Sequence, residues 1–459
     1  MLFSSITFLY YFLPCVLIIY FLVPRKFRNL VLLLASLVFY AWGEPKYVIL
    51  MAISIGIGYV SGLYIEKYRG RSLSRYIMAV SVAMCLSLLG YFKYANFFAD
   101  NVNQLLGKNV LIVNVALPIG ISFFTFQIIS YIIDVYRGVK SQRNLISLAA
   151  YVSMFPQLIA GPIVRYVDIE KQLNNRKENI DDTALGIQRF MLGLGKKIFI
   201  ANILGEFCDI FHASTDKSVV FFWLYAIAYS LHVYFDFSGY SDMAIGLGKI
   251  FGFHFLENFN YPFISKSATE FWRRWHMSLG TWFRDYVYIP LGGNRKGKAR
   301  WFFNIFVVWM LTGFWHGAAW NFVVWGLWFG IILIIEKLWL LKWLEKSQIL
   351  SRIYVWIVLL CSFVIFGATD MGQAISYIGS MFGAGAYPLI SAECIYYLKS
   401  FGVVMVMAFI GATPVVKNTV SKMGKVKTIL EPVVMILIIL VATAYLVDDS
   451  FNPFLYFRF

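Results

Sequence analysis

Long apolar stretches recur along the whole chain and limit how it can fold. A helix that crosses the hydrocarbon of a membrane needs about 17 residues or more, and stretches of roughly this length occur near residues 6–23, 47–65, 76–92, 218–235, 317–335, 353–369, 400–416 and 429–447. The ten-residue alternation of a membrane β-strand is absent from the sequence, so helices remain as the way to satisfy the backbone in lipid. With the shorter apolar stretches between them, these segments predict an all-α polytopic membrane protein with about ten to twelve transmembrane or re-entrant helices.

The charged residues agree with this class and suggest an orientation. Only 14% of the 459 residues are charged, and the net charge of +16 is spread over short loops instead of one soluble face. This distribution argues against nucleic acid as a partner and favours membrane lipid. Basic residues collect in cytoplasmic loops, and Arg25, Lys26 and Arg28 directly follow the first apolar stretch. We therefore expect a multi-pass protein with an extracytoplasmic N-terminus.

The sequence carries no motif for a metal or for nucleotide hydrolysis. Its five cysteines are isolated, without CxxC spacing, so neither a zinc site nor a disulfide framework is predicted. The segment "GGNRKGKA" (292–299) fits GxxxxGK, but Ala299 stands where a P-loop needs Ser or Thr to bind magnesium. We predict no metal site and no ATP hydrolysis.

One histidine lies in an unusually apolar environment. His316 belongs to "LTGFWHGAAWNF" (311–322), inside a stretch, 301–335, that has no Asp, Glu, Lys or Arg. As a helix, the residues from Trp301 to Trp315 span roughly 22 Å, less than the roughly 30 Å of hydrocarbon, so two segments should meet near His316 within the membrane. Small neighbours, Gly313 and Gly317 among them, allow another chain or a ligand to approach closely.

The chemistry of His316 follows from this environment. Removal from water favours the neutral imidazole, and a neutral imidazole accepts a proton. Ionisable residues inside a membrane usually have a function. The alternative is a histidine that only joins two helices by a hydrogen bond.

A second histidine, His276, lies in the basic and aromatic segment "FWRRWHMSLGTWFRDYVYIPLGG" (271–293), which is typical of the headgroup level of a membrane. Basic residues in and after this segment could hold the phosphates of a nucleotide-like donor or bind anionic lipid, and composition does not choose between them. They are Arg273, Arg274, Arg284, Arg295, Lys296, Lys298 and Arg300.

A third polar group follows in "HVYFDFSGYSD" (232–242), where His232 and Asp236 are four residues apart and share a helix face. With Asp242 they could form a proton relay or a weak metal site, but no further ligand cluster completes such a site. The pattern favours a packed polar pair.

The middle of the chain differs from its ends. Between residues 117 and 341 the apolar stretches are broken by Gly, Pro and isolated polar residues, which persist at membrane depth only where they face protein or a water-filled cavity. We therefore predict one membrane-embedded domain, 1–459, with a catalytic core at 117–341 and flanking helices at 1–93 and 352–447.

Several motifs in this core form a specific set, and the two ends of the chain, "MLFSSITFLYYFLP" and "NPFLYFRF", accompany them. The core motifs are "LPIGISFFTFQ" (117–127), "FPQLIAGPIVRY" (155–166), "YFDFSGYSDMAIGLGKIFGF" (234–253), "FWRRWHMSLGTWFRDYVYIPLGGNR" (271–295) and "LTGFWHGAAWNFVVWG" (311–326). With them the chain resembles the membrane-bound O-acyltransferase (MBOAT) family, and in particular its bacterial AlgI-like branch of alginate and polysaccharide O-acetylation.

The resemblance implies a fold in which helices surround a central polar channel. It implies an acetyltransferase of the bacterial cytoplasmic (inner) membrane that takes acetyl from acetyl-CoA, a substrate and not a tightly bound cofactor, on the cytoplasmic side. The acceptor would be a cell-surface polysaccharide such as alginate, another exopolysaccharide or peptidoglycan, reached with the help of an extracytoplasmic acetyltransferase partner protein.

The resemblance also implies roles for individual residues. His316 matches the catalytic histidine of the family and His276 the earlier histidine of the same core. Further residues of these motifs are expected to bind the donor or line the channel: Trp272, Arg273, Trp275, Arg284, Asp285, Asn294, Trp315 and Asn321.

Two other functions stay open. D-alanyl transfer to teichoic acid, from a carrier-protein thioester, is the alternative within the same family (DltB-like). A transporter or flippase of an acylated carrier would also suit a polar-lined cavity, although the two pseudo-symmetric halves usual in transporters are not detectable in the sequence.

Overall fold

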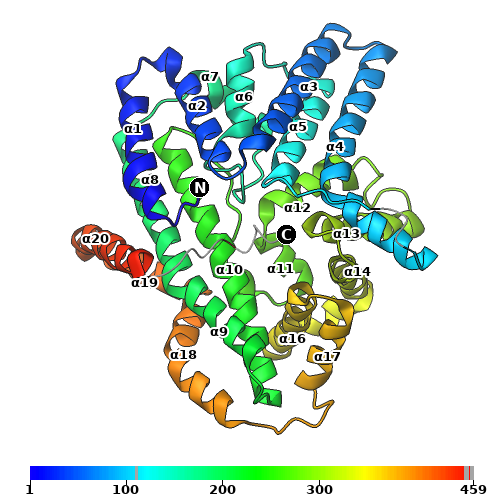
Figure 1. Ribbon diagram of the computed structural model, residues 1–459, viewed down its shortest axis with the longest axis vertical. Coiled ribbons are helices and arrows are strands. Elements are labelled where there is room, and N and C mark those ends of the chain that lie inside the picture. The colour runs from blue at the N-terminus through cyan, green and yellow to red at the C-terminus, as the bar shows by residue number, and fades with distance from the viewer. Residues whose placement is uncertain (109–111, 449–453, 455–459) are drawn as a thin grey trace. The chain divides into compact units, whose positions relative to one another are not determined.

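The computed structural model describes residues 1–108, 112–448 and 454, and its regular elements over these residues are all helical (Figure 1). The α-helices are α1 (Leu13–Leu22), α2 (Arg28–Ala41), α3 (Val48–Lys67), α4 (Ser72–Leu106), α5 (Ile121–Tyr136), α6 (Leu145–Ser153), α7 (Tyr166–Asn175), α8 (Ile180–Gly195), α9 (Ile203–Ala213), α10 (Val219–Ile250), α11 (Ala268–Arg274), α12 (Met277–Phe283), α13 (Lys298–His316), α14 (Trp320–Ile335), α15 (Leu341–Leu344), α16 (Gln348–Gly367), α17 (Met371–Met381), α18 (Ala392–Gly411), α19 (Val415–Ser421) and α20 (Lys425–Asp448).

The predicted apolar stretches are helical in the structure. Among the described residues, 7 helices are long and apolar enough to cross a membrane: Pro45–Lys67, Ser72–Leu106, Val219–Ile250, Trp320–Leu344, Gln348–Gly367, Ala392–Gly411 and Lys425–Asp448. The first predicted stretch is the shorter apolar helix Thr7–Leu22, and Ile121–Tyr136 is another of this kind. For the described residues, the prediction of an all-helical chain with several helices of membrane-spanning length is therefore confirmed.

The chain divides into two compact units. The first consists of Met1–Phe190 and Ser241–Leu256, and the second of Met191–Tyr240 and Glu257–Phe459. Helices α8 and α10 each contribute residues to both units.

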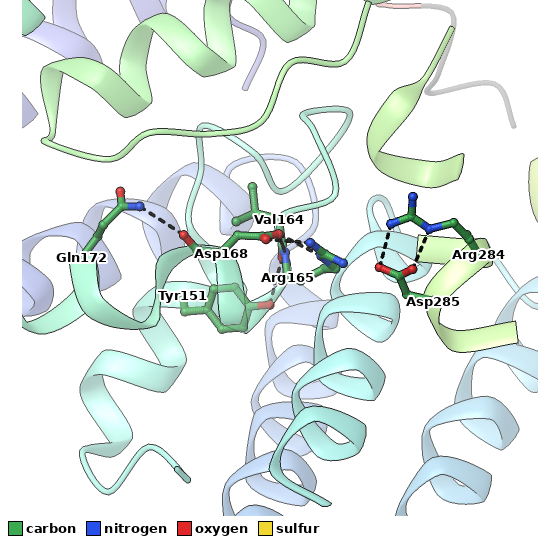
Figure 2. Close-up of polar contacts among 7 residues, drawn as sticks. All are labelled: Tyr151, Val164, Arg165, Asp168, Gln172, Arg284 and Asp285. Atoms are coloured by element: carbon green, nitrogen blue, oxygen red, sulfur yellow. Dashed lines mark hydrogen bonds and ion pairs between the residues drawn. The ribbon is translucent and has the colours of Figure 1, made fainter. Parts of the chain in front are cut away.

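In the first unit, α3, α4 and α5 pack side by side, as the blue to cyan helices of Figure 1 show. A buried polar cluster joins the end of α1 to the segment before α8, since Tyr20 donates to Glu178 Oε1 (2.6 Å) and Arg28 Nη1 lies 2.5 Å from Glu178 Oε2. The start of α7 is fixed locally, because Arg165 binds Asp168 (2.8 Å) and Tyr151 donates to Val164 O at 2.9 Å (Figure 2).

In the second unit, an apolar and aromatic core joins α9, α10, α14, α16 and α18. Glu336, fully buried at the end of α14, fixes the beginning of α11. Its carboxylate accepts hydrogen bonds from the backbone N–H groups of Ala268 (2.6 Å) and Thr269 (2.8 Å). These are among the first N–H groups of a helix, which have no partner inside the helix itself, so Glu336 holds α11 in the position from which it presents the residues of the candidate site.

Candidate active site

His276 occupies a sharp break between two short helices of the second unit. Helix α11 ends at Arg274, α12 begins at Met277, and His276 between them has φ 46°, in the left-handed region. This conformation costs a residue with a side chain about 1–3 kcal/mol and is concentrated at functional sites. The side chain is almost completely buried (1% exposed), and its Nδ1 lies 3.0 Å from Asn258 Oδ1.

A cavity of about 160 Å³ opens beside His276. Its wall is mostly aromatic, and its lining includes Trp272, Trp275, His276, Gly280, Arg284 and Thr312. Two buried polar atoms of this lining, His276 Nε2 and Trp272 Nε1, have no hydrogen-bond partner among the described residues. The cavity is therefore a largely apolar space whose lining also includes a few polar residues, an arrangement typical of small-molecule sites.

The protonation state of His276 suits a role as a proton acceptor. Burial lowers the pKa of His276, which lies outside the helices long enough to span a membrane. A buried imidazole is disfavoured in its charged form because the interior solvates charge poorly. At neutral pH the ring that lines the cavity is thus uncharged.

His316 lies at the turn of a helical hairpin. Helix α13 ends at His316 itself, and α14 begins at Trp320, so the predicted meeting of two segments near His316 is confirmed. The ring is buried (7% exposed) and packs against Trp325, with centroids 5.0 Å apart, and against Phe366 at 5.4 Å. His316 is not among the described residues that line the cavity, although Trp309 and Thr312, which precede it on α13, are.

Trp315 lies next to both histidines. Its ring centroid is 4.9 Å from that of His316 and 6.0 Å from that of His276, and its side chain is buried. The two candidate catalytic histidines therefore belong to one packed aromatic region of the second unit.

Glycines bring the two helices of the hairpin together. A Cβ on Gly313 would clash with the carbonyl oxygen of Phe322, and one on Gly326 would clash with that of Trp309. Gly317 likewise allows the Phe322 ring to approach. The small residues near His316 were predicted to let another chain or a ligand approach closely. In the structure, it is α14 that approaches them.

We expect Gly313→Ala to separate α13 from α14 and to lower both stability and activity. Overpacking of this kind typically costs about 1–3 kcal/mol, and the displaced His316 should reduce acyl transfer. Thermal unfolding in detergent measures the first effect and ester formation the second. Gly90→Ala in α4, where a Cβ meets nothing within 4 Å, is the matched control; equal melting of the two variants would contradict the prediction.

The other predicted site residues fall into different surroundings. Trp272 and Trp275 line the cavity, as does the exposed Arg284, which pairs with its neighbour Asp285 at 2.7 Å (Figure 2). Arg273 and Asn294 are exposed, and neither is among the lining residues. Asn321 is buried, and its amide donates to Ala368 O at 2.9 Å, which ties the start of α14 to the end of α16.

The polar residues of α10 have separate partners. His232 Nδ1 lies 2.6 Å from Ala201 O, and Asp236 is paired with Lys197 at 2.6 Å. Asp242, in the first unit, is paired with Arg189 at 2.8 Å. No group of three or more potential metal ligands occurs among the described residues.

Three buried polar residues of the second unit were not found from the sequence: Lys197, Asn258 and Glu336. Each has a partner 18 or more residues away in the chain. The only sign of these three residues in the sequence was that each is a charged or amide residue inside an apolar or aromatic stretch.

Comparison with known proteins places this site in a family. The model of the MBOAT, or membrane-bound O-acyltransferase, family matches residues 48–369, which include both histidines. The chain belongs to the membrane-bound O-acyltransferase family. It is therefore an acyltransferase of a membrane.

Relatives in this family carry different named activities. The chain is 41% identical, over 100% of both sequences, to a probable alginate O-acetylase of Pseudomonas putida. It is 34% identical to the peptidoglycan O-acetyltransferase of Helicobacter pylori, over 89% of this chain and 85% of the relative. It is also 34% identical to the teichoic acid D-alanyltransferase of Bacillus subtilis, over 54% of this chain and 67% of the relative.

Proposed function

We propose that this membrane-bound O-acyltransferase transfers acetyl from acetyl-CoA to hydroxyl groups of a cell-surface polysaccharide. The named activities of the O-acetylating relatives, which match over most or all of the chain, support acetyl and a polysaccharide. The observation that carries the proposal is the cavity, which His276 and Arg284 both line. Burial lowers the pKa of His276 and so favours its neutral imidazole. A guanidinium at this point suits the phosphates of a nucleotide-like donor.

The proposed reaction uses His316 as a general base. The imidazole takes the proton of the acceptor hydroxyl, whose oxygen forms a bond to the thioester carbonyl carbon. The bond from that carbon to sulfur then breaks, and the CoA thiolate leaves and takes up the proton from the imidazolium. His276 positions or polarises one of the reacting groups from the cavity.

The proposal includes a location and an orientation. The protein would lie in the bacterial inner membrane, with the N-terminus outside and the basic segment from Gly292 to Arg300 on the cytoplasmic side. The shorter helices would complete a set of about ten to twelve crossing or re-entrant segments around a central polar channel. An extracytoplasmic acetyltransferase would complete delivery to the polymer.

The purified protein in liposomes tests the proposal. Acetyl-CoA is supplied on one side and a soluble polysaccharide on the other, and polymer-bound ester is measured. The B. subtilis relative supports D-alanyl transfer as a second candidate. A D-alanylated carrier protein as the only accepted donor would favour that candidate, and export of an acylated carrier without ester formation would favour a transporter.

We expect Gly280→Trp to block the cavity without disturbing the protein around it. Gly280 lies on α12 and lines the cavity, and a Cβ at this position meets nothing within 4 Å. The indole should therefore occupy ligand space and raise the KM for acetyl-CoA by at least about tenfold, because a pocket binds its ligand by enclosing it. Gly280→Ala is the control and should keep its KM; an unchanged KM in the tryptophan variant would mean that the donor binds elsewhere.

A further inference from the structure

Asn258 holds the turn that carries His276. It lies before α11, is 1% exposed, and its backbone oxygen accepts from the N–H of Met277 at 3.0 Å. Its side-chain Oδ1 is 3.0 Å from His276 Nδ1 and accepts from the Ser278 hydroxyl at 2.9 Å. The Ser278 backbone nitrogen lies 3.4 Å from the same oxygen. With its side-chain amide and its backbone carbonyl, Asn258 thus contacts three consecutive residues around the break between α11 and α12.

The orientation of this amide is decided by the backbone. A backbone N–H is always a donor, so the Asn258 atom that faces the Ser278 nitrogen has to be the carbonyl oxygen. An amide oxygen only accepts hydrogen bonds, and therefore His276 Nδ1 carries the proton that joins the two side chains. In a neutral imidazole the second nitrogen then has the free lone pair.

That second nitrogen belongs to a residue that lines the cavity. His276 Nε2 is buried and has no hydrogen-bond partner among the described residues, and His276 is one of the lining residues. We propose that Asn258 is a positioning residue that fixes His276 as the Nδ1–H tautomer and so directs a proton-accepting Nε2 into the cavity. The identity of the ligand rests on the proposed function, but its chemistry at this point follows from the tautomer: it presents a hydroxyl, thiol or amide N–H to Nε2.

A direct measurement of the tautomer tests this inference. The chain has five histidines, so selective ¹⁵N-histidine labelling of the detergent-solubilised protein gives few signals, and those of His276 are assigned by their loss in His276→Gln. Wild type is expected to show a protonated Nδ1 and an unprotonated Nε2. A protonated Nε2 in wild type would overturn the proposal.

Variants separate positioning from a general structural role. Asn258→Leu removes the acceptor and should give a mixture of both His276 tautomers. Asn304→Leu is the control, because Asn304 is also a fully buried amide of the second unit, bound to Gly293 O at 2.8 Å, and it should leave the His276 signals unchanged. A wild-type tautomer in Asn258→Leu would refute the role of Asn258.

Asn258→Asp keeps the inference testable if the leucine variant does not fold. The carboxylate accepts the same hydrogen bonds and favours the charged imidazole, so His276 should remain protonated to higher pH, by about one unit or more in a titration of its ¹⁵N signals. If the pKa of His276 in Asn258→Asp equals that in wild type, the contact between residue 258 and His276 Nδ1 is contradicted.

These measurements do not depend on activity. If the tautomer is as stated and His276→Gln still transfers acetyl at the wild-type rate, the proposed function of His276 is wrong while the positioning by Asn258 stands. If His276→Gln is inactive and wild type carries the proton on Nε2, only the positioning fails.

Discussion

His316→Ala is expected to lose O-acyl transfer by about 10²–10⁴-fold, the contribution of a well-positioned general base. The loss should appear in kcat, because the imidazole is proposed to act on the acceptor hydroxyl during the reaction. Ester formed on the polysaccharide, measured with the purified protein in liposomes, gives the rate. Binding of acetyl-CoA should change little, since His316 is not among the described residues that line the cavity.

The aromatic packing around His316 requires matched controls. The ring contacts Trp325 and Phe366, so alanine leaves a space and costs some stability. His316→Gln retains more of the volume and should be equally inactive but more stable. His254→Ala should retain activity, because this side chain of the first unit is 58% exposed and lies 3.9 Å from Asp182. An active His316→Gln variant would assign the role of base to His276, the histidine that lines the cavity.

The sequence predicted the membrane helices and the hairpin at His316 because both depend on local composition. Apolar length predicts a spanning helix, and the break at Gly317 follows from a short apolar helix and a cluster of small residues. The headgroup level of the basic and aromatic segment around His276 stays a prediction, but three of its motif neighbours, Trp272, Trp275 and Arg284, line the cavity with His276.

The contacts that fix the site were not predictable in the same way. Asn258 and His276 are 18 residues apart, on either side of α11 in the chain, and Glu336 reaches α11 from 67 or more residues away. Such pairs arise only after the helices have packed, so no spacing rule identifies them. For Asp236, the helix spacing indicated a shared face with His232, but it gave no sign of the ion pair that Asp236 makes with Lys197 from another helix.

Breaking the pair between Lys197 and Asp236 is expected to destabilise the second unit by about 3–5 kcal/mol. The side chains are 0% and 3% exposed, and Nζ lies 2.6 Å from Oδ1. Either Lys197→Met or Asp236→Leu leaves one charge buried without its counterion, which is the costly state. Chemical or thermal unfolding in detergent, compared with wild type, measures the change in the free energy of unfolding.

The double variant Lys197→Met/Asp236→Leu should recover most of this loss, because replacing both members of a buried ion pair by apolar residues is often neutral or stabilising. The control is Lys249→Met in the first unit, where Lys249 lies 3.7 Å from Asp182 with side chains 27% and 22% exposed. This more exposed pair should contribute about 1 kcal/mol or less. Additive losses in the double variant would show that the two charges are not coupled.

The activity of the double variant decides what the pair is for. His232 lies on the same helix, with Nδ1 2.6 Å from Ala201 O, so a proton relay through this group is the functional alternative to packing. If the ion pair only stabilises the fold, the double variant should be stable and should transfer acetyl at close to the wild-type rate. A variant that is stable but inactive would mean that the ionisable groups themselves take part in the reaction, because the packing has been restored without them.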